Sequence, residues 1–385
     1  MSEHHVEHEH RVTPLELFFD LVFVFAFTQV TSLLSHDPTW PGLGRGLLVL
    51  GALWWAWTAY AWLTNTVDAD EGAVRGAMLA AMGAMLVASF AVPEAFDDHG
   101  VLFGIAYFVV RAMHIALYAL AGRGDPDLLR AVLRMTPSTL LGSALILAAG
   151  FVDGAVKPAL WATALAIDYG GVLVGRARGW RVHPAHFAER HGLIIIIALG
   201  ESIVAAGVGA AGIPLDKGVI VAAVLGLAAA AGFWMAYFDF FAISAQRILS
   251  EKRGAAQAAL ARDGYSYLHL PMVAGIILFA LALKETLAHV GDHLDTIYAV
   301  ALCGGSALYL LAYVALRVRV SGRLSRGRLV TSIAFLLLIP AATAMPALAA
   351  LTVVTAVWAA LHGYELLWYR EARAEIRARS PRPAS

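Results

Sequence analysis

The sequence predicts an all-α membrane protein, a bundle of about twelve transmembrane helices in two parallel six-helix repeats. Of its 385 residues, 60% are hydrophobic and only 15% are charged, and the mean hydropathy is +0.70. Ordinary soluble domains are about 25% charged and about 45–50% apolar. Apolar runs of about 17–25 residues, the length that crosses hydrocarbon as a helix, recur along the chain. The composition therefore predicts a polytopic protein embedded in the lipid bilayer.

The first six apolar runs are separated by short loops, and ionisable residues within three of them are candidates for function. Glu16 and Asp20 lie in the first run, Arg111 in the fourth and Asp168 in the sixth. Charged residues inside a membrane segment face the bundle interior and mark candidate functional sites. These runs span 15–35, 43–65, 74–93, 100–121, 133–151 and 157–175.

The second six runs begin with a polar segment that becomes continuously apolar at Leu193 and is interrupted only at Glu201. Pro340 and Pro346 could divide the last two runs in more than one way, because proline favours the end of a helix. These runs span 192–211, 218–244, 268–288, 294–316, 329–345 and 347–369.

Positive charge gathers on one side of this topology. When the N-terminus and every second loop are placed on that side, it holds 23 of the 28 Lys and Arg residues. Arg45, Lys157 and Lys217 lie on the other side, and Arg111 and Lys284 fall within runs. Because cytoplasmic loops carry an excess of Lys and Arg, we expect both termini in the cytoplasm and the protein in the plasma or inner membrane.

Several classes of function are disfavoured by the composition. Lys plus Arg equals Asp plus Glu, at 28 each, so the net charge suggests no nucleic-acid partner. The single cysteine, Cys303, excludes an internal disulfide and a cysteine-based metal site within one subunit. The N-terminus is acidic and His-rich, so no cleaved signal peptide is expected. We predict no metal or other cofactor, and the absence of a loop large enough for a catalytic domain favours a role other than an enzyme.

An internal repeat is suggested by residues that recur in a consistent order. Trp57 and Tyr60 in the second run match Trp234 and Tyr237 in the eighth. Since six is an even number, the halves would be parallel, as in some transporters. The expected division is a cytoplasmic tail at 1–14, repeats at 15–182 and 183–370, and a basic cytoplasmic tail at 371–385. Further matches are Asp98-His99 with Asp292-His293, Ala116-Leu-Tyr118 with Ala307-Leu-Tyr309, Ala26-Phe-Thr-Gln29 with Ala198-Leu-Gly-Glu201, and Asp168 with His362.

Glu201 is the strongest candidate for a functional residue. Placing a charge at the centre of a membrane helix costs roughly 2.5–3.5 kcal/mol on insertion scales, so such a residue is a functional-site hypothesis. Arg111 and His114, three apart on one helix face, are candidate partners, and the alternative is a Glu201–Arg111 pair that only fixes packing. The full set that we predict to bind a solute or ion is Glu201, Gln29, Arg111, His114, Asp168 and His362.

A second group is expected at the cytoplasmic mouth. Glu16 and Asp20 share one helix face because they are four residues apart. They could instead hold neighbouring loops through Arg190 or Arg176. A metal site at His183, His186 and Glu189 is disfavoured, because ligands on consecutive helical turns lie too far apart to meet one ion. The residues predicted for a cytoplasmic gate are Glu16, Asp20, His186, Glu189 and Arg190.

Two stretches carry a resemblance to a known family. VTPLELFFDLVFVFAFTQV at 12–30 and HFAERHGLIIIIALGES at 186–202 resemble the signature stretches of the bacterial low temperature requirement protein A (LtrA) family. The resemblance covers essentially the whole chain and implies a multi-pass membrane protein linked to growth in the cold. It implies importance, without a mechanism, for Glu16, Phe19, Asp20, Gln29, His186, Glu189, Arg190, Gly200 and Glu201.

The function that we expect is a secondary transporter or permease for a small solute or ion. Glu201 would bind a proton or cation, Asp168 and His362 would assist, and Arg111 would supply the counter-charge. One alternative is a membrane-embedded enzyme, metal or cofactor protein that uses His114, His186 and His362. Another is a sensor of membrane state, although the short loops speak against it. The substrate and the oligomeric state cannot be read from the sequence.

Overall fold

The computed structural model describes residues 12–67, 72–175, 177–239 and 241–368. Helices make up its secondary structure, and the described residues form no strand, only an isolated bridge between His293 and Pro346. Residues 1–11 of the predicted N-terminal tail and the whole predicted tail at 371–385 lie outside the described residues. Eleven helical segments within these ranges are long and apolar enough to cross a membrane.

The helices follow the predicted runs closely. The segment at 156–174, which carries Lys157 and Asp168, is the sixth long helix but is not one of the eleven apolar candidates. The first seven are α1 (Pro14–His36), α2 (Trp40–Thr64), α3 (Gly72–Ala91), α4 (Gly100–Ala121), α5 (Pro126–Ala149), α6 (Val156–Val174) and α7 (Pro184–Gly209).

Later segments depart from the expected runs in two places. The predicted run 218–244 is divided, because α8 ends at Phe238 and a separate short helix follows. The run expected at 268–288 starts earlier and contains a π-helical stretch, η3. Pro346 lies between the last two helices, whereas Pro340 lies inside one of them. These elements are α8 (Lys217–Phe238), α9 (Phe241–Glu251), α10 (Gly254–Leu260), η3 (Ala261–Tyr267), α11 (His269–Ala288), α12 (Thr296–Ala299), η4 (Val300–Gly304), α13 (Gly305–Ser321), α14 (Arg326–Thr343) and α15 (Ala347–Trp368).

The start of α1 is fixed by a capping box. Thr13 Oγ1 accepts from the backbone N–H of Glu16, and the Glu16 side chain accepts from the backbone N–H of Thr13. Pro14 occupies the first helical turn, where a missing N–H costs no hydrogen bond. The cap therefore sets the position of Glu16 relative to the rest of the helix.

The exterior of the bundle is apolar and its interior holds the polar groups. Leu337, Val330 and Phe90 are exposed, whereas Arg111, Arg190 and Arg328 are buried. Soluble proteins show the opposite arrangement. The distribution matches a helical bundle surrounded by lipid, in which polar side chains must find partners inside.

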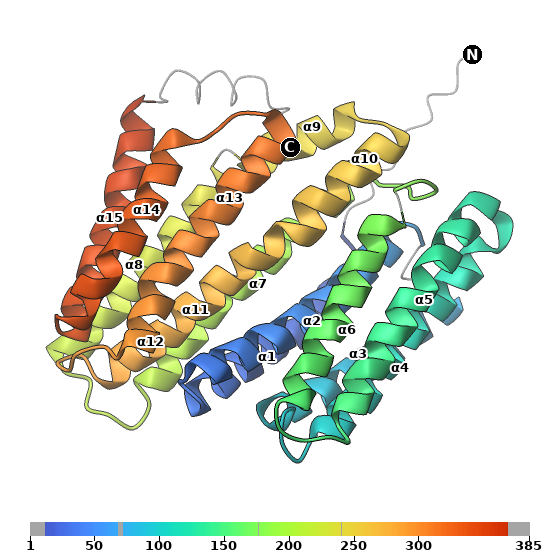
Figure 1. The fold of residues 1–385 in the computed structure, drawn as a ribbon. Coiled ribbons are helices and arrows are strands. Elements are labelled where there is room, and N and C mark those ends of the chain that lie inside the picture. The colour runs from blue at the N-terminus through green and yellow to red at the C-terminus, as the bar shows by residue number, and fades with distance from the viewer. Residues whose placement is uncertain (1–11, 68–71, 176, 240, 369–385) are drawn as a thin grey trace.

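Each half of the chain forms its own group of helices, and the groups lie side by side (Figure 1). In the first group α1 contacts α2 and α3, and the contacts then continue from α3 to α4, α5 and α6, which returns to α2. In the second group α7 contacts α8 and α11, and the contacts continue to α13, α14 and α15, which returns to α8. The groups meet where α1 and α2 pack against α7 and α11.

Candidate functional site

Arg190 joins the first and seventh helices. Its Nη1 donates to Glu16 Oε1 at 2.7 Å and its Nη2 donates to Asp20 Oδ1 at 2.7 Å. Trp57 Nε1 also donates to Asp20 Oδ1, at 2.9 Å. The three charged side chains are buried. Arg190 is thus one of the two partners predicted for these acids, and the other, Arg176, lies outside the described residues.

His186 extends this group from one helical turn before Arg190. Its Nε2 lies 3.0 Å from both carboxylate oxygens of Glu16, and its Nδ1 lies 3.1 Å from Asn65 Nδ2. The amide nitrogen of Asn65 can only donate, so Nδ1 accepts and the proton resides on Nε2, which donates to Glu16. We call Glu16, Asp20, His186 and Arg190 the arginine cluster.

The arginine cluster holds two carboxylates against one guanidinium. Asp20 Oδ2 and Arg190 Nε have no hydrogen-bond partner among the described residues. Moving a charged side chain from water into the protein costs several kcal/mol, and the attraction between the paired charges is of about the same size. These contacts tie α1 to α7 through buried charges.

Glu189 does not belong to the arginine cluster. Its side chain is exposed and accepts from the backbone N–H of Val12 at 3.3 Å. The structure thus brings together four of the five residues predicted at the cytoplasmic mouth and places the fifth elsewhere on the same helix.

Glu201 lies buried between α7 and α1. Thr28 Oγ1 is 2.6 Å from Glu201 Oε2, and Glu201 is 2% exposed. Lys284 on α11 donates to Ser35 Oγ at 2.8 Å, and no ion pair joins any Lys, Arg or His of the described chain to Glu201. Gln29, next to Thr28, is half-buried. Glu201 is therefore a buried acid held by a hydroxyl.

The partner of Arg111 is Asp168, which corrects the expectation that Arg111 pairs with Glu201. Arg111 Nη2 donates to both oxygens of Asp168, at 2.9 and 3.2 Å, and Nη1 donates to the carbonyl oxygen of Trp55 at 3.0 Å. Thr139 Oγ1 donates to Asp168 Oδ1 at 3.0 Å. This group lies inside the first half, between α2, α4, α5 and α6, so its charges already compensate each other.

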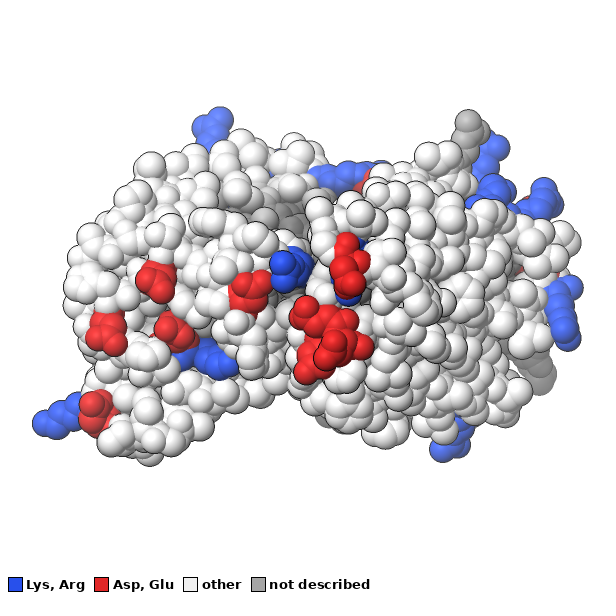
Figure 2. Space-filling view, turned by 60° about the horizontal axis from the view of Figure 1, so that its bottom comes forward, with Lys and Arg blue, Asp and Glu red and all other residues white. Residues whose placement is uncertain are grey.

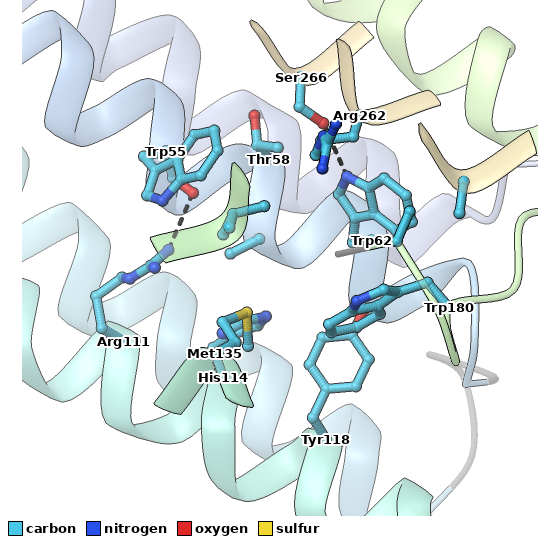
Figure 3. Close-up of a pocket in the computed structure, with 14 residues that line it drawn as sticks. Trp55, Thr58, Trp62, Arg111, His114, Tyr118, Met135, Trp180, Arg262 and Ser266 are labelled. Carbon is cyan, nitrogen blue, oxygen red and sulfur yellow. Dashed lines mark hydrogen bonds between the residues drawn. The ribbon is translucent and has the colours of Figure 1, made fainter. Parts of the chain in front are cut away.

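His114 lines a pocket that residues of both halves enclose (Figure 3). The pocket holds about 540 Å³ including its open mouth. Trp55, Trp62 and Trp180 provide aromatic walls, and Arg262 reaches it from η3 in the second half. We call it the tryptophan pocket. Trp180 and Arg262 come from a loop and a π-helical stretch, so no periodic pattern in the sequence pointed to them.

His362 lies in the second half, away from the residues expected to share a site with it. Its Nε2 is 2.8 Å from the carbonyl oxygen of Gly232, and its ring stacks on Trp358. Close to it, Arg328 donates to Glu365 through Nε at 2.7 Å and through Nη2 at 3.0 Å. The predicted solute site is therefore divided among three places, and the histidines of the metal alternative do not meet.

Sequence reasoning also missed a buried group around His191. His191 Nδ1 lies 2.9 Å from the carbonyl oxygen of Phe187, and its ring packs against Tyr265, His269 and Trp57. Tyr237 and His269 share a hydrogen bond of 2.9 Å. The sequence feature that could have pointed to this group is the position of His191 directly after Arg190, inside one of the two signature stretches. In the described part of the chain, no group of three or more His, Cys, Asp or Glu could hold a metal ion.

Acidic side chains are spread over one end of the molecule, with a few basic ones among them (Figure 2). This end is opposite the one at which the described chain begins and ends (Figure 1). The loops and run ends expected on this side contain Asp37, Glu94, Asp97, Asp98, Asp153, Asp216, Glu285, Asp292 and Asp295, against Arg45, Lys157, Lys217 and Lys284.

Comparison with known proteins agrees with the resemblance of the two signature stretches. A protein of Rhizobium meliloti (strain 1021), described as uncharacterized, is 31% identical over 323 residues, which cover 80% of this chain and 77% of the relative. No solved structure matches the chain. The family model of the bacterial low temperature requirement A protein (LtrA) matches residues 11–362. The chain, a multi-pass membrane protein, therefore belongs to the LtrA family.

Proposed function

We propose that this protein is a secondary transporter or permease for a small solute or ion, and that Glu201 is its coupling carboxylate. A coupling group must bind and release a proton or cation during the transport cycle. It therefore needs to be buried from bulk water yet free of a permanent counter-charge.

The observation that carries this proposal is the difference between Glu201 and the other buried acids. Glu16 and Asp20 pair with Arg190, Asp168 pairs with Arg111, and Glu365 pairs with Arg328. Glu201 is as buried as these, but among the described residues it forms no ion pair, and Lys284, whose Nζ donates to Ser35, acts on it only from a longer distance. A paired carboxylate is held ionised by its arginine, whereas an unpaired one can exchange its charge.

Thr28 suits both charge states of Glu201. Its Oγ1 is 2.6 Å from Glu201 and 3.2 Å from the carbonyl oxygen of Val24. A hydroxyl has a single proton to donate. When Glu201 is ionised, Thr28 donates to it; when Glu201 is protonated, the acid donates to Thr28, and Thr28 donates to Val24. Neither state leaves the carboxyl group without a hydrogen bond.

The position of Glu201 fits a role in conformational change. It lies where α7 packs against α1, one of the contacts between the two groups of helices. Transporters built from repeats move one part against another around a site at the repeat interface. A proton on Glu201 would change the charge of that interface and so favour one arrangement over the other.

We also propose that the halves arose by duplication and that both termini are cytoplasmic. The circular order of contacts is the same in both groups of helices, which supports the repeats at 15–182 and 183–370. The excess of Lys and Arg on one side supports a cytoplasmic location of that side in the plasma or inner membrane.

Purified protein in liposomes with a pH-sensitive dye inside would test the transport proposal. Inward gradients of organic acids, amino acids, sugars, amines and monovalent cations would be applied in turn. We expect one class to drive proton movement in the wild type, and Glu201→Gln to abolish it, because an amide cannot exchange a proton in this range.

Glu285→Gln is the matched control, because Glu285 is a partly exposed acid that pairs with His289. This variant should retain the proton movement. Undiminished solute-driven proton movement in Glu201→Gln, from mildly acidic to mildly alkaline pH, would show that Glu201 does not couple transport.

A further inference from the structure

The tryptophan pocket contains buried polar groups that lack a hydrogen bond of good geometry within the described chain. Thr58 Oγ1, the Tyr118 hydroxyl and both ring nitrogens of His114 make no such bond, although Tyr118 lies near Thr66 and His114 near the backbone of Ala59. These side chains are at most 3% exposed. Native proteins pair nearly all of their buried polar groups. The pocket is therefore built to receive a molecule that can hydrogen-bond.

The charged residues around the pocket indicate whether the bound molecule is an anion or a cation. Arg111 and Arg262 line the pocket, and no Asp or Glu does. Arg111 is compensated by Asp168, but Asp263 is shared, because it lies 2.7 Å from Arg262 and 2.8 Å from Arg319. One carboxylate therefore faces two guanidinium groups, of which Arg262 lines the pocket. The surplus positive charge favours an anion and disfavours the organic cation for which an aromatic cage is suited.

The aromatic walls of the pocket favour a particular shape of ligand. Trp62 and Trp180 meet edge to face with ring centroids 5.9 Å apart, and Tyr118 meets Trp180 at 5.2 Å. Trp62 is held in place by a hydrogen bond of 2.8 Å from its Nε1 to Ser266 Oγ. Figure 3 shows these rings around one part of the pocket, with His114 and Trp55 beside it. Fixed aromatic walls favour a flat, ring-containing ligand, since such rings stack or meet edge to face.

We propose that the tryptophan pocket binds a small aromatic carboxylate. The ring would pack among the tryptophan side chains, and the carboxylate would accept hydrogen bonds from Arg262 and from the Tyr118 and Thr58 hydroxyls. Charge-assisted hydrogen bonds to a guanidinium are among the strongest in proteins. Glu201 does not line this pocket, so binding can be measured without transport and is independent of the transport proposal.

Fluorine NMR of para-fluorobenzoate with the full-length protein in detergent would test this proposal. We expect saturable broadening with the acid and much weaker broadening with para-fluorobenzamide, its neutral analogue. Arg262→Gln should weaken binding of the acid at least about tenfold. Arg247→Gln, which removes an exposed arginine paired with Glu251, should leave binding unchanged.

Two hydroxyl variants separate the pocket from general effects on folding. Tyr118→Phe and Thr58→Val, each of which removes one of the pocket hydroxyls, should weaken binding while thermal unfolding stays cooperative. Tyr309→Phe is the control, because its hydroxyl donates to Phe233 outside the pocket. Absence of broadening at millimolar concentrations, equal binding of acid and amide, or equal effects of Tyr118→Phe and Tyr309→Phe would overturn the proposal.

Discussion

The buried charged residues of this protein are of two kinds. Arg111, Arg190 and Arg328 each pair with an acid inside the bundle, whereas Glu201 is held by the hydroxyl groups of Thr28 and Thr31. The first kind fixes the arrangement of helices, because removal of either partner leaves a buried charge uncompensated. The second kind is free to change its charge, and this difference is the physical basis of the function that we propose.

Arg190→Ala should strongly destabilise the protein. The change leaves Glu16 and Asp20 buried without their counter-charge, and we expect the free energy of unfolding to fall by about 3–5 kcal/mol. Circular dichroism during unfolding in mixed detergents would measure it. Arg247→Ala is the control, because its pair with Glu251 is exposed and such pairs contribute at most about 1 kcal/mol. Similar losses in the two variants would contradict a structural role for the arginine cluster.

The sequence identified most of the candidate site residues, but only some of their partners. Glu16 and Asp20 are one turn apart on a helix, and the motif containing Arg190 was an obvious source of their counter-charge. The match of Arg111 with Glu201 was wrong. Both Glu201 and Asp168 lie within apolar runs, and the sequence does not show which of them faces Arg111 in the packed bundle. The pairing with Asp168 depends on how α4 packs against α5 and α6, which hydrophobic length does not specify.

Among the elements, α11 and α13 come into close backbone contact at a pair of glycines. A Cβ atom on Gly275 would lie 2.5 Å from the carbonyl oxygen of Gly305, and one on Gly305 would lie 2.7 Å from that of Gly275. Small residues allow membrane helices to pack by close backbone contact, since lipid removes the hydrophobic drive between them. The crossing therefore depends on both glycines.

Gly275→Ala should destabilise the protein by about 1–3 kcal/mol, because the added methyl group meets backbone atoms that cannot move aside. Gly207→Ala on α7 is the control, since a Cβ there meets nothing within 4 Å, and it should be neutral or stabilising by up to about 1 kcal/mol. Thermal unfolding of both variants in one detergent would compare them. A neutral Gly275→Ala would show that the helices do not depend on this close approach.

Helix number followed from the sequence because the thickness of a bilayer fixes the length of an apolar run. The local irregularities of the helices could not be predicted in this way. The end of α8 at Phe238 and the π-helical stretch at Ala261–Tyr267 lie within apolar or mixed sequence and depend on contacts with other helices. The tryptophan pocket, which takes Arg262 from that stretch, could not be predicted for the same reason.

At the scale of the whole molecule, two similar groups of helices meet along α1, α2, α7 and α11. Both the arginine cluster and Glu201 lie where α1 meets α7, and the tryptophan pocket also takes residues from both groups. This placement fits a protein in which movement between the halves carries the function. The orientation of the molecule in the membrane is a separate prediction, which rests on the distribution of Lys and Arg.

Cysteine labelling would test that orientation. In a Cys303→Ala background, Asp153→Cys should react with a membrane-impermeant maleimide in intact cells, because Asp153 lies in a loop expected outside the cytoplasm. Ser321→Cys should react only after permeabilisation. Both positions are exposed, so their accessibility within the fold is matched. Reaction of Ser321→Cys, but not of Asp153→Cys, in intact cells would reverse the proposed topology.

The most direct test of the central claim is an infrared difference spectrum of the purified protein between mildly acidic and mildly alkaline pH. If Glu201 exchanges a proton, the wild type shows a protonated-carboxyl band that persists in Glu285→Gln and disappears in Glu201→Gln. The same band in Glu201→Gln as in the wild type would contradict the claim and assign the exchangeable proton to another residue.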